Sequence, residues 1–375
     1  MTAVFDVAIV GGGIAGASMA YRLAPHRSVV VLERESACGY HSTGRSAAEY
    51  SRQFQNELVG LLCDASWEFL TSPPEGFTEV PLLRHRGTVN IAPADKAALV
   101  DAALIETRLH SPEARLLTVE EAVAMVPFLR PEWLGGALYD PLSWDMEVET
   151  LLQGFIRFAR RAGAEFRTGQ DVTAVARENG CYRLETSGGP VLARKLVNAA
   201  GAWADPLAEL AGLTPLGLTP MRRTAITVDV PDGIDVGVLP SVNELDETFY
   251  FKPEAGKLMV SPADEHPSAA CDAQPEDLDV AYAAHYLQES TTLPVQTISH
   301  KWAGLRTFAP DRRQVVGFSP QDPDFFWLAG QGGSGILTSP ALSAWAASEF
   351  LTGEPPADLL ALGLPVDVFR PDRLA

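Results

Sequence analysis

The sequence predicts an α/β domain joined to a second domain that is built mainly of strands. At the N-terminus, the apolar run Val7–Val10 is followed by glycines and then by a helical pattern over Ala15–Leu23. Ser28–Leu32 has the composition of a second strand, so residues 4–33 are predicted to form one βαβ unit. By contrast, residues 216–307 are mainly strand-like. These two regions predict the α/β part and the strand-rich part respectively.

At 375 residues the chain is long enough for two domains, at about 150 residues per domain. The middle of the chain again has an α/β pattern. It contains a helical pattern over residues 147–161 and alternating, strand-like segments over residues 172–175, 182–185 and 192–196. The C-terminal part again has the pattern of strand, glycine turn and helix. We therefore expect two interleaved domains, the α/β one formed by residues 1–45, 146–215 and 308–375 and the strand-rich one by residues 46–145 and 216–307.

The composition argues against several classes of partner. A formal net charge of −19 would repel both nucleic acid and an anionic membrane surface. The four cysteines lie far apart without a Cys-x-x-Cys pair, so the sequence predicts no metal site and no disulfide framework.

The N-terminus lacks the basic region of an export signal, and we expect a cytoplasmic monomer. Residues 325–348 carry no charge, but their glycines, Gln331 and Pro340 favour a buried strand, turn and helix over a membrane span.

The first strand and helix are joined by Gly11-Gly-Gly13-Ile-Ala-Gly16, which fits the pattern G-x-G-x-x-G. Gly11 would make the tight turn, Gly13 would let the backbone approach a pyrophosphate, and Gly16 would permit close packing of helix and strand. The helix N-terminus offers free N–H groups and a positive dipole to the phosphates. Glu33 ends the second strand roughly 20 residues later, where an acid accepts hydrogen bonds from the ribose of the adenosine half. The segment predicts a Rossmann-type nucleotide site.

Three further segments favour FAD over NAD as the nucleotide. An NAD-linked dehydrogenase would continue with βα repeats after Glu33, whereas Gly39–Ala48 is a polar turn that leads into a predicted helix start. Leu196–Trp203 is predicted as a short buried strand that ends in a glycine turn, and Trp327–Ile336 as a strand, a glycine-rich turn and then a helix. The N-terminus of that last helix could stabilise the negative charge of a reduced flavin ring. Together the segments indicate one extended cofactor.

These glycine segments, in this order, resemble the D-amino acid oxidase superfamily of FAD enzymes, which includes sarcosine and glycine oxidases. Leu32–Glu35, Phe249–Pro253 and Trp302–Arg306 resemble, more narrowly, bacterial FAD-dependent D-arginine dehydrogenases. The resemblance implies a Rossmann-type (GR2-like) FAD-binding domain interleaved with a mixed-sheet substrate domain. It assigns cofactor contacts to Gly11, Gly13, Ile14, Ala15, Gly16, Glu33, Arg34, Ser42, Thr43, Arg45, Ser46, Ala47, Val172, Ala200, Gly201, Trp203, Arg306, Gly332, Gly333, Ser334, Gly335 and Ile336.

The same resemblance places the substrate carboxylate on Arg223, Tyr250 and Arg306, and the amino group on the backbone carbonyl of Gly333. Tyr250 and Arg306 are the expected catalytic residues. A planar guanidinium can hold a carboxylate through two hydrogen bonds and so fix the substrate Cα above the flavin. Of the neighbours Arg222 and Arg223, strand alternation sends one inward, and the resemblance selects Arg223.

Four positions of the substrate pocket depart from the D-arginine dehydrogenase pattern. Thr88 stands where that family has a glutamate for the substrate guanidinium, Phe54 replaces a tyrosine, and Leu337 replaces a glutamine. These changes predict a more apolar pocket. Glu49, in place of a histidine, argues the other way, because an unpaired acid there could hold a cationic substrate; the alternative is a solvated or ion-paired acid at a helix start. All four positions are candidate substrate contacts.

The sequence therefore predicts an FAD-dependent enzyme that oxidises a D-amino acid, with a neutral or apolar side chain, to the imino acid and on to the 2-oxo acid. Hydride would pass from Cα to flavin N5 while the amine is neutral, so no side chain need act as a strong base. Oxidation of a secondary amine, such as an N-methyl or cyclic amino acid, is an alternative that the same residues would serve. A flavin-holding subunit of a larger electron-transfer assembly is another.

We expect a dehydrogenase that passes its electrons to a quinone or another acceptor and reacts slowly with oxygen. Sarcosine oxidases place a lysine near the flavin on a strand that follows a glycine, and a fixed positive charge there favours the formation of superoxide. In Ala255–Ser261 the matching position is Leu258, whereas Lys257 is expected on the opposite face of the strand. A slip of one residue in the alignment would exchange the two faces.

The FAD is predicted to be bound without a covalent link. In sarcosine oxidases a cysteine just before a Thr-x-x-Pro-Asp segment is attached to the flavin, whereas Gly304 occupies the matching place before Thr307–Asp311. Acid or heat precipitation should therefore release yellow FAD into the supernatant, where its absorbance is measured. A pellet that stays yellow after denaturation would contradict the prediction.

Overall fold

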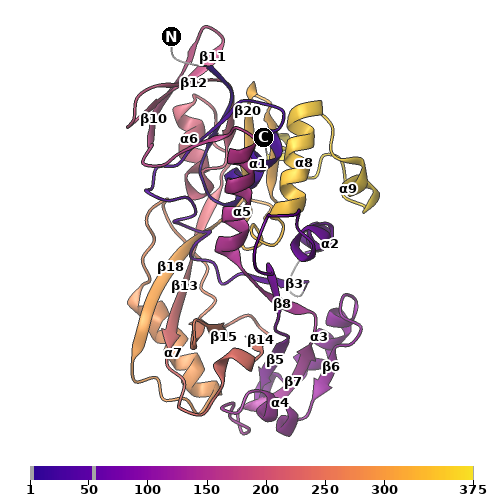
Figure 1. The fold of residues 1–375 in the computed structure, drawn as a ribbon. Helices are drawn as coiled ribbons and strands as arrows, with labels where there is room; N and C mark the ends of the chain where they lie inside the picture. Colours follow the sequence, from indigo (N-terminus) through magenta and orange to yellow (C-terminus); the bar gives the residue numbers. More distant parts are fainter. Residues whose placement is uncertain (1–3, 53–55, 375) are drawn as a thin grey trace.

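The computed structural model describes residues 4–52 and 56–374, and its strands form three sheets (Figure 1). The eight-stranded sheet contains β1 (Val4–Val10), β2 (Val29–Leu32), β9 (Glu165–Arg167), β10 (Val172–Glu178), β11 (Cys181–Thr186), β12 (Val191–Asn198), β19 (Val315–Ser319) and β20 (Asp322–Ala329). The nine-stranded sheet contains β5 (Thr88–Pro93), β6 (Arg115–Leu117), β7 (Leu134–Asp140), β13 (Thr219–Val228), β14 (Ser241–Glu244), β15 (Tyr250–Glu254), β16 (Lys257–Ser261), β17 (His266–Pro267) and β18 (Ile298–Phe308). The small sheet contains β3 (Glu49–Ser51), β4 (Leu83–His85) and β8 (Ser143–Met146).

The α-helices of the described residues are α1 (Ile14–Leu23), α2 (Glu57–Thr71), α3 (Leu99–Arg108), α4 (Val119–Met125), α5 (Val148–Arg161), α6 (Ala204–Leu210), α7 (Asp277–Ser290), α8 (Ser339–Thr352) and α9 (Ala357–Ala361). The predicted βαβ unit is confirmed, because α1 connects two strands, β1 and β2, that pair in parallel. Across residues 4–52 and 56–374 there is no helix with the length and apolar character needed to cross a membrane. The uncharged segment 325–348 forms the end of β20, a turn and most of α8, as predicted.

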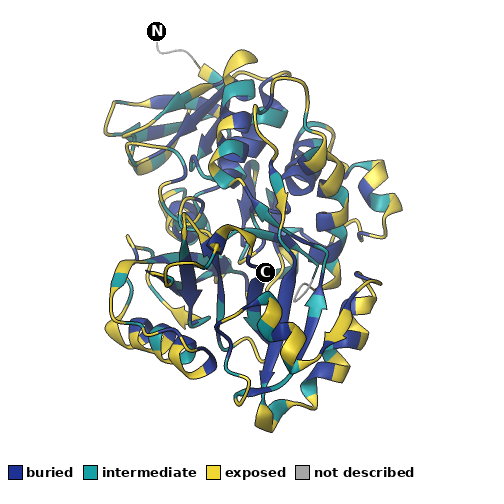
Figure 2. Cartoon of the chain, turned by 60° about the horizontal axis from the view of Figure 1, so that its bottom comes forward, coloured by how far each residue is buried: buried dark blue, intermediate teal, exposed yellow. Residues whose placement is uncertain are grey.

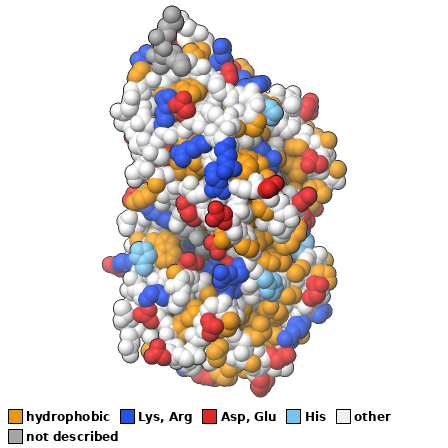
Figure 3. All heavy atoms as spheres, in the orientation of Figure 1, with side chains coloured by type: hydrophobic (Ala, Val, Ile, Leu, Met, Phe, Trp, Pro, Cys, Tyr) orange, Lys and Arg blue, Asp and Glu red, His pale blue; other side chains and the backbone are white. Residues whose placement is uncertain are grey.

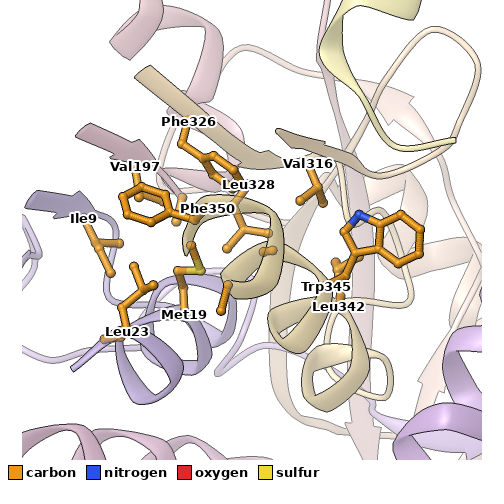
Figure 4. Packing of buried hydrophobic residues seen from close by; sticks show 14 of the residues in the cluster. Ile9, Met19, Leu23, Val197, Val316, Phe326, Leu328, Leu342, Trp345 and Phe350 are labelled. Atoms are coloured by element: carbon orange, nitrogen blue, oxygen red, sulfur yellow. The ribbon is translucent and has the colours of Figure 1, made fainter. Parts of the chain in front are cut away.

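The eight-stranded sheet has a parallel centre, in which β9, β2, β1, β12 and β20 lie in that order. Side chains alternate between its two faces, and both faces are buried, as in other parallel sheets. Ile9 points to the face that packs against α1 and α8, where Met19 lies (Figure 4). Val31 and Trp345 belong to the same apolar cluster. The opposite face packs against α6. Because β1 and β12 are parallel, the turns that follow them leave the sheet at the same end, where the carboxyl ends of these strands lie.

The nine-stranded sheet buries one face and leaves the other free to line a site. Phe251 and Leu258 pack with Val280 and Leu287 of α7 in an apolar cluster that also includes residues of α4. Figure 2 shows the buried strands inside and the exposed residues on the outer sides of the helices. These observations confirm the predicted fold class, an α/β sheet combined with a mixed sheet. The predicted boundaries of the two interleaved domains stay a prediction.

One local expectation is wrong. The turn at Gly39–Ala48 does not lead into a helix but into strand β3, because Glu49 and Tyr50 pair with Asp145 and Trp144 of β8. Long-range strand pairing here overrides the helical preference of the small residues. The helix predicted after the last glycine turn is present as α8, although it begins only at Ser339, since hydrogen-bonded turns occupy the residues before it. In addition, α2, which lies within the expected substrate domain, packs against α8.

Candidate active site

One cavity runs from the glycine turn after β1 to the loop between β20 and α8, and we call it the dinucleotide cavity. Its walls come from the ends of β1, β2 and β12 and from the turns that follow them. Most of the expected cofactor contacts line it, namely Gly11, Gly13, Ile14, Ala15, Glu33, Arg34, Ser42, Thr43, Ser46, Val172, Ala200, Gly201, Trp203, Arg306, Gly332, Gly333, Gly335 and Ile336.

The turn after β1 can be built only with glycines. A Cβ atom on Gly11 would lie 2.3 Å from the carbonyl oxygen of Ala199, and the residue has φ of +107°. A Cβ atom on Gly16 would lie 1.9 Å from the carbonyl oxygen of Gly11, so Gly16 lies behind the cavity and permits the close packing expected of it. Thr43 Oγ1 accepts a hydrogen bond from the Ile14 backbone N–H at 3.0 Å, which holds the polar turn against the start of α1.

Glu33 is fixed by two backbone groups beside this turn. Its Oε2 atom accepts a hydrogen bond from Gly12 N at 2.7 Å, and its Oε1 atom accepts one from Glu35 N at 2.9 Å. Each oxygen keeps a further lone pair, and the carboxylate borders the cavity. An acid at the end of the second strand together with a glycine turn at a helix start fits the ribose and pyrophosphate of a dinucleotide.

An aromatic platform borders the part of the cavity near Glu33. The guanidinium of Arg34 lies over the Trp203 ring at 4.2 Å, and the His41 ring lies 4.7 Å from the same ring. His41 was not expected from the sequence. Among the described residues, it is the only histidine that lines the dinucleotide cavity, and its ring is oriented by a 2.9 Å contact between Nε2 and Glu35 Oε1. A planar group such as adenine suits these surroundings.

Three expected cofactor contacts lie outside the dinucleotide cavity besides Gly16. Arg45 points away from it, because NH1 donates to the carbonyl oxygens of Ala273 and Ala303 at 2.9 and 3.0 Å and NH2 pairs with Asp272. Arg45 thus connects the polar turn to β18 and the loop before α7. Ala47 and Ser334 line the neighbouring cavity instead.

The second cavity lies against the free face of the nine-stranded sheet, and we call it the substrate cavity. It meets the dinucleotide cavity along the β20–α8 loop, because both are lined by Ser46, Arg306, Gln331, Gly332, Gly333 and Ile336. Its volume is about 340 Å³, within the range of small-molecule sites. The expected substrate contacts Glu49, Arg223, Tyr250 and Leu337 also line it.

Arg223, Tyr250 and Arg306 stand together on three strands of one sheet, β13, β15 and β18. Burial raises the pKa of Tyr250, but the positive charges of Arg306 and Arg223 outweigh burial and hold this pKa below its ordinary value. Burial and the repulsion of Arg223 lower the pKa of the Arg306 guanidinium. Among the described residues, Arg223 Nε is buried without a hydrogen-bond partner. The group is therefore built to receive an anion.

Arg222 and Arg223 point to opposite sides of β13. Arg222 pairs with Asp279 of α7 at 3.1 Å and with Glu276, outside the cavity. Arg223 lies opposite Gly304 of β18 and lines the cavity. The cavity thus carries positive side chains although the chain as a whole has a net charge of −19, and acidic, basic and apolar side chains are mixed on the face seen in Figure 3.

Glu49 and Thr88 form one unit, contrary to the expectation that each would line the pocket separately. Glu49 lies on strand β3 and not at a helix start. Thr88 is buried, and its hydroxyl donates to Glu49 Oε1 at 2.8 Å, so Thr88 lies behind Glu49 and does not line the cavity. Leu337 is buried at the cavity wall. Phe54 lies outside the described residues.

Glu49 belongs to a set of four ionisable side chains, together with Asp145, Lys252 and Arg86. Lys252 Nζ lies 2.9 Å from Asp145 Oδ1, and Arg86 Nε donates to Asp145 Oδ2 at 2.7 Å. Burial raises the pKa of Glu49, although Lys252 and the hydroxyls of Thr88 and Ser143 act against this shift. With Glu49 ionised, two positive and two negative charges balance in this set; with Glu49 protonated, the set has one positive charge in excess. In neither case does it carry net negative charge.

The expectation for Leu258 is wrong. This side chain is buried in the apolar cluster under α7, away from the substrate cavity, because the pleat of β16 directs residues 258 and 260 toward the helix. Lys257 does lie on the other face, where it pairs with Asp229 at the surface. The sequence comparison also missed Lys252, which is buried on β15 with Nζ 3.4 Å from the carbonyl oxygen of Ala48.

Further residues of the substrate cavity carried no signal in the sequence. Asn243 lies on β14 and lines the cavity, and Glu247 is an exposed acid in the turn that follows this strand. Glu265 and Arg312 come from two loops at the cavity wall. None of these four residues belongs to a motif, and strands and loops far apart in the chain bring them together. Only the long-range topology could have identified them.

Comparison with known proteins identifies the family. The family described as DAO, FAD dependent oxidoreductase, matches residues 6–349. Glycine oxidase of Geobacillus kaustophilus is 26% identical over 359 residues, which is 91% of either chain. Mitochondrial dimethylglycine dehydrogenase of Rattus norvegicus is 25% identical over 382 residues, or 95% of this chain but 44% of that protein. The crystal structure of L-proline dehydrogenase from P. horikoshii has the same fold, with a TM-score of 0.82 at 23% identity over 100% of this chain and 98% of that one. The family match covers most of the chain and agrees with the dinucleotide cavity: the chain belongs to the DAO family of FAD-dependent oxidoreductases, and its cofactor is FAD.

Proposed function

We propose that this protein oxidises the Cα–N bond of an amino acid, and that its substrates are D-amino acids with a neutral side chain. The observation that carries the proposal is the group of Arg223, Tyr250 and Arg306 in a cavity that meets the dinucleotide cavity. Two guanidinium groups and a phenol suit the carboxylate that all amino acids share. Relatives named glycine oxidase and dimethylglycine dehydrogenase support amino-acid chemistry.

In this proposal the chain orients the substrate and excludes other geometries. Arg223 and Arg306 hold the carboxylate, and the Tyr250 hydroxyl donates a hydrogen bond to it. The carbonyl oxygen of Gly333 accepts a hydrogen bond from the amino group. Because the two ends of the substrate are held, Cα is fixed where the two cavities meet. FAD, held by the residues of the dinucleotide cavity, would supply the chemistry of hydride acceptance when bound. The amine reacts in its neutral form in this proposal, so no side chain acts as a strong base.

The side chain of the substrate extends toward Glu49 and Leu337 in this arrangement. Glu49 is already balanced by Lys252 and Arg86, so a guanidinium or ammonium group would find no net negative charge there. Leu337 adds an apolar wall. These features favour a neutral side chain over the cationic one of D-arginine.

Oxidation of a secondary amine is the second candidate. Dimethylglycine dehydrogenase and L-proline dehydrogenase, by their names, act on amino acids whose nitrogen is alkylated. We call Arg223, Tyr250 and Arg306 the carboxylate clamp. In the proposal these side chains do not contact the substrate nitrogen, so the clamp would serve a secondary amine equally well. A panel of N-methyl and cyclic amino acids beside primary ones separates the two candidates.

The first test is Arg306→Lys. A lysine ammonium cannot reproduce the two parallel hydrogen bonds of a guanidinium. The fall in kcat/KM should therefore correspond to a loss of roughly 2–4 kcal/mol of transition-state stabilisation, while FAD stays bound. Steady-state kinetics and the flavin content of the purified variant measure both quantities. Arg222→Lys is the matched control, because that side chain pairs with acids outside the cavity. Unchanged kcat/KM, or loss of flavin with full activity per flavin, would overturn the assignment.

The second test is anaerobic bleaching of the flavin with D- and L-amino acids. We expect D-amino acids with neutral or apolar side chains to bleach it fastest and D-arginine to be poor, because its charge would be left unpaired in a buried pocket. If D-arginine or D-lysine proves best, the charge balance around Glu49 is misjudged. Glu49→Gln should then abolish that preference.

The third test concerns the electron acceptor. We propose a dehydrogenase that reduces a quinone or a dye, since no lysine lines either cavity within the described part of the chain and the arginines Arg223 and Arg306 serve the substrate. Reoxidation of the reduced flavin by oxygen, followed by stopped flow, should be much slower than its reduction by substrate. Reoxidation as fast as reduction at air saturation would identify an oxidase. In that event Lys252→Met should slow it and Lys257→Met should not.

A further inference from the structure

The carboxylate of Glu265 lies beside the carboxylate clamp formed by Arg223, Tyr250 and Arg306. The NH2 nitrogen of Arg312 donates to both Oε atoms of Glu265 at 3.0 Å. Glu265 Oε1 also lies 3.8 Å from NH2 of Arg223, which is an ionic contact beyond hydrogen-bond distance. All three side chains line the substrate cavity. Arg312 therefore holds the carboxylate that would otherwise pair with Arg223.

Both members of the Glu265–Arg312 pair are held by their surroundings. Next to Glu265, the buried Asp264 accepts hydrogen bonds from the Thr224 backbone N–H at 2.6 Å and from the Thr224 hydroxyl at 3.0 Å, which fixes this loop to β13. The guanidinium of Arg312 lies over the Phe308 ring at 3.9 Å. Phe308 follows Arg306 by two residues on β18, so both side chains point to the same face of the strand.

Arg312 adopts a backbone conformation that disfavours side chains. Its φ is +61°, in the left-handed region, and its N–H donates to the carbonyl oxygen of Ala309 at 2.9 Å. A residue other than glycine adopts this region at a cost in free energy. The turn thus places a long cationic side chain over Phe308 and against Glu265, although the local backbone would favour glycine.

We propose that Glu265 is an internal anion that competes with the substrate for Arg223, and that Arg312 is a positioning residue that keeps Glu265 away from the clamp. The proposal rests on the proposed function, since it takes Arg223 and Arg306 as the carboxylate site. Among the described residues, Arg223 and Arg312 are the only cations paired with Glu265. Without Arg312, Glu265 pairs with Arg223, neutralises it and repels the incoming carboxylate.

The test measures binding of propionate, a simple monocarboxylate, to the FAD-loaded enzyme by the change in flavin absorbance. Arg312→Ala should raise the Kd about threefold to fivefold, the upper end of the scale for a partly exposed ion pair. It should raise KM for the best amino acid by a similar factor and leave kcat within about twofold. Glu265→Gln should bind propionate at least as well as the wild type, and the double variant should return to within about twofold of the wild-type Kd.

The double variant separates positioning from a merely structural role. If Arg312 only supported the loop, or if it bound the carboxylate directly, removing Glu265 would not restore binding. Arg313→Ala is the matched control, because Arg313 is exposed and lines neither cavity. An Arg312→Ala variant that binds propionate as the wild type does, or a double variant as weak as Arg312→Ala, overturns the proposal. If propionate does not bind the wild type at all, the carboxylate clamp itself is wrong and the proposed function fails with it.

Discussion

Two guanidinium groups, those of Arg223 and Arg306, lie together in the substrate cavity, and the pairing of the surrounding strands keeps them there. Antiparallel pairing of β13 and β18 places Arg306 opposite Met221 and Arg223 opposite Gly304, so both arginines lie on one face of the sheet. Their mutual repulsion and burial lower the pKa of Arg306. An incoming carboxylate relieves this repulsion, which is the physical reason for the carboxylate-binding role that we propose.

The clamp depends on strands, whereas the groups that surround it come from loops. Arg223, Tyr250 and Arg306 belong to paired strands, and a sheet fixes side chains more closely than a loop does. Glu265, Arg312 and Gly333 belong to connecting segments. Because Arg306 lines both cavities, the residue that we propose orients the substrate also borders the dinucleotide cavity. A substitution there is therefore expected to act on substrate geometry first.

The parts of this structure that could be predicted from the sequence are those whose information is local. The turn Gly11–Gly16, its two strands and Glu33 lie within one short segment, and the pattern that predicts them is also the pattern that packs them. Contacts between distant segments could not be predicted in this way. Glu49 and Thr88 lie on strands of different sheets, so the sequence treats them as independent positions, yet one donates a hydrogen bond to the other.

The error at Leu258 has a related cause. A strand offers two faces, and an alignment in a variable segment does not say which face meets the cofactor, since a shift of one residue reverses every side chain. In the structure the apolar residues of β16 choose the face, because Leu258 and Val260 complete the core under α7. The polar residue Ser261 is left to face Tyr250, its partner on β15. Core packing thus decides the orientation of this strand, and the site receives the side chains that the core does not use.

Glu49, the acid near the proposed position of the substrate side chain, shows how a single residue can mislead. The D-arginine dehydrogenase pattern has a glutamate at the position of Thr88, and this chain has its acid at Glu49, which Thr88 contacts. A carboxyl group is therefore retained close to the same place. What differs is its surroundings, because Lys252 and Arg86 supply positive charge that balances Glu49 and Asp145. A cationic substrate responds to the summed charge of such a set, since partners within a few ångströms act on it together. On this reasoning the preference for neutral side chains that we propose follows from the balance of four charges, and the presence or absence of one glutamate does not decide it.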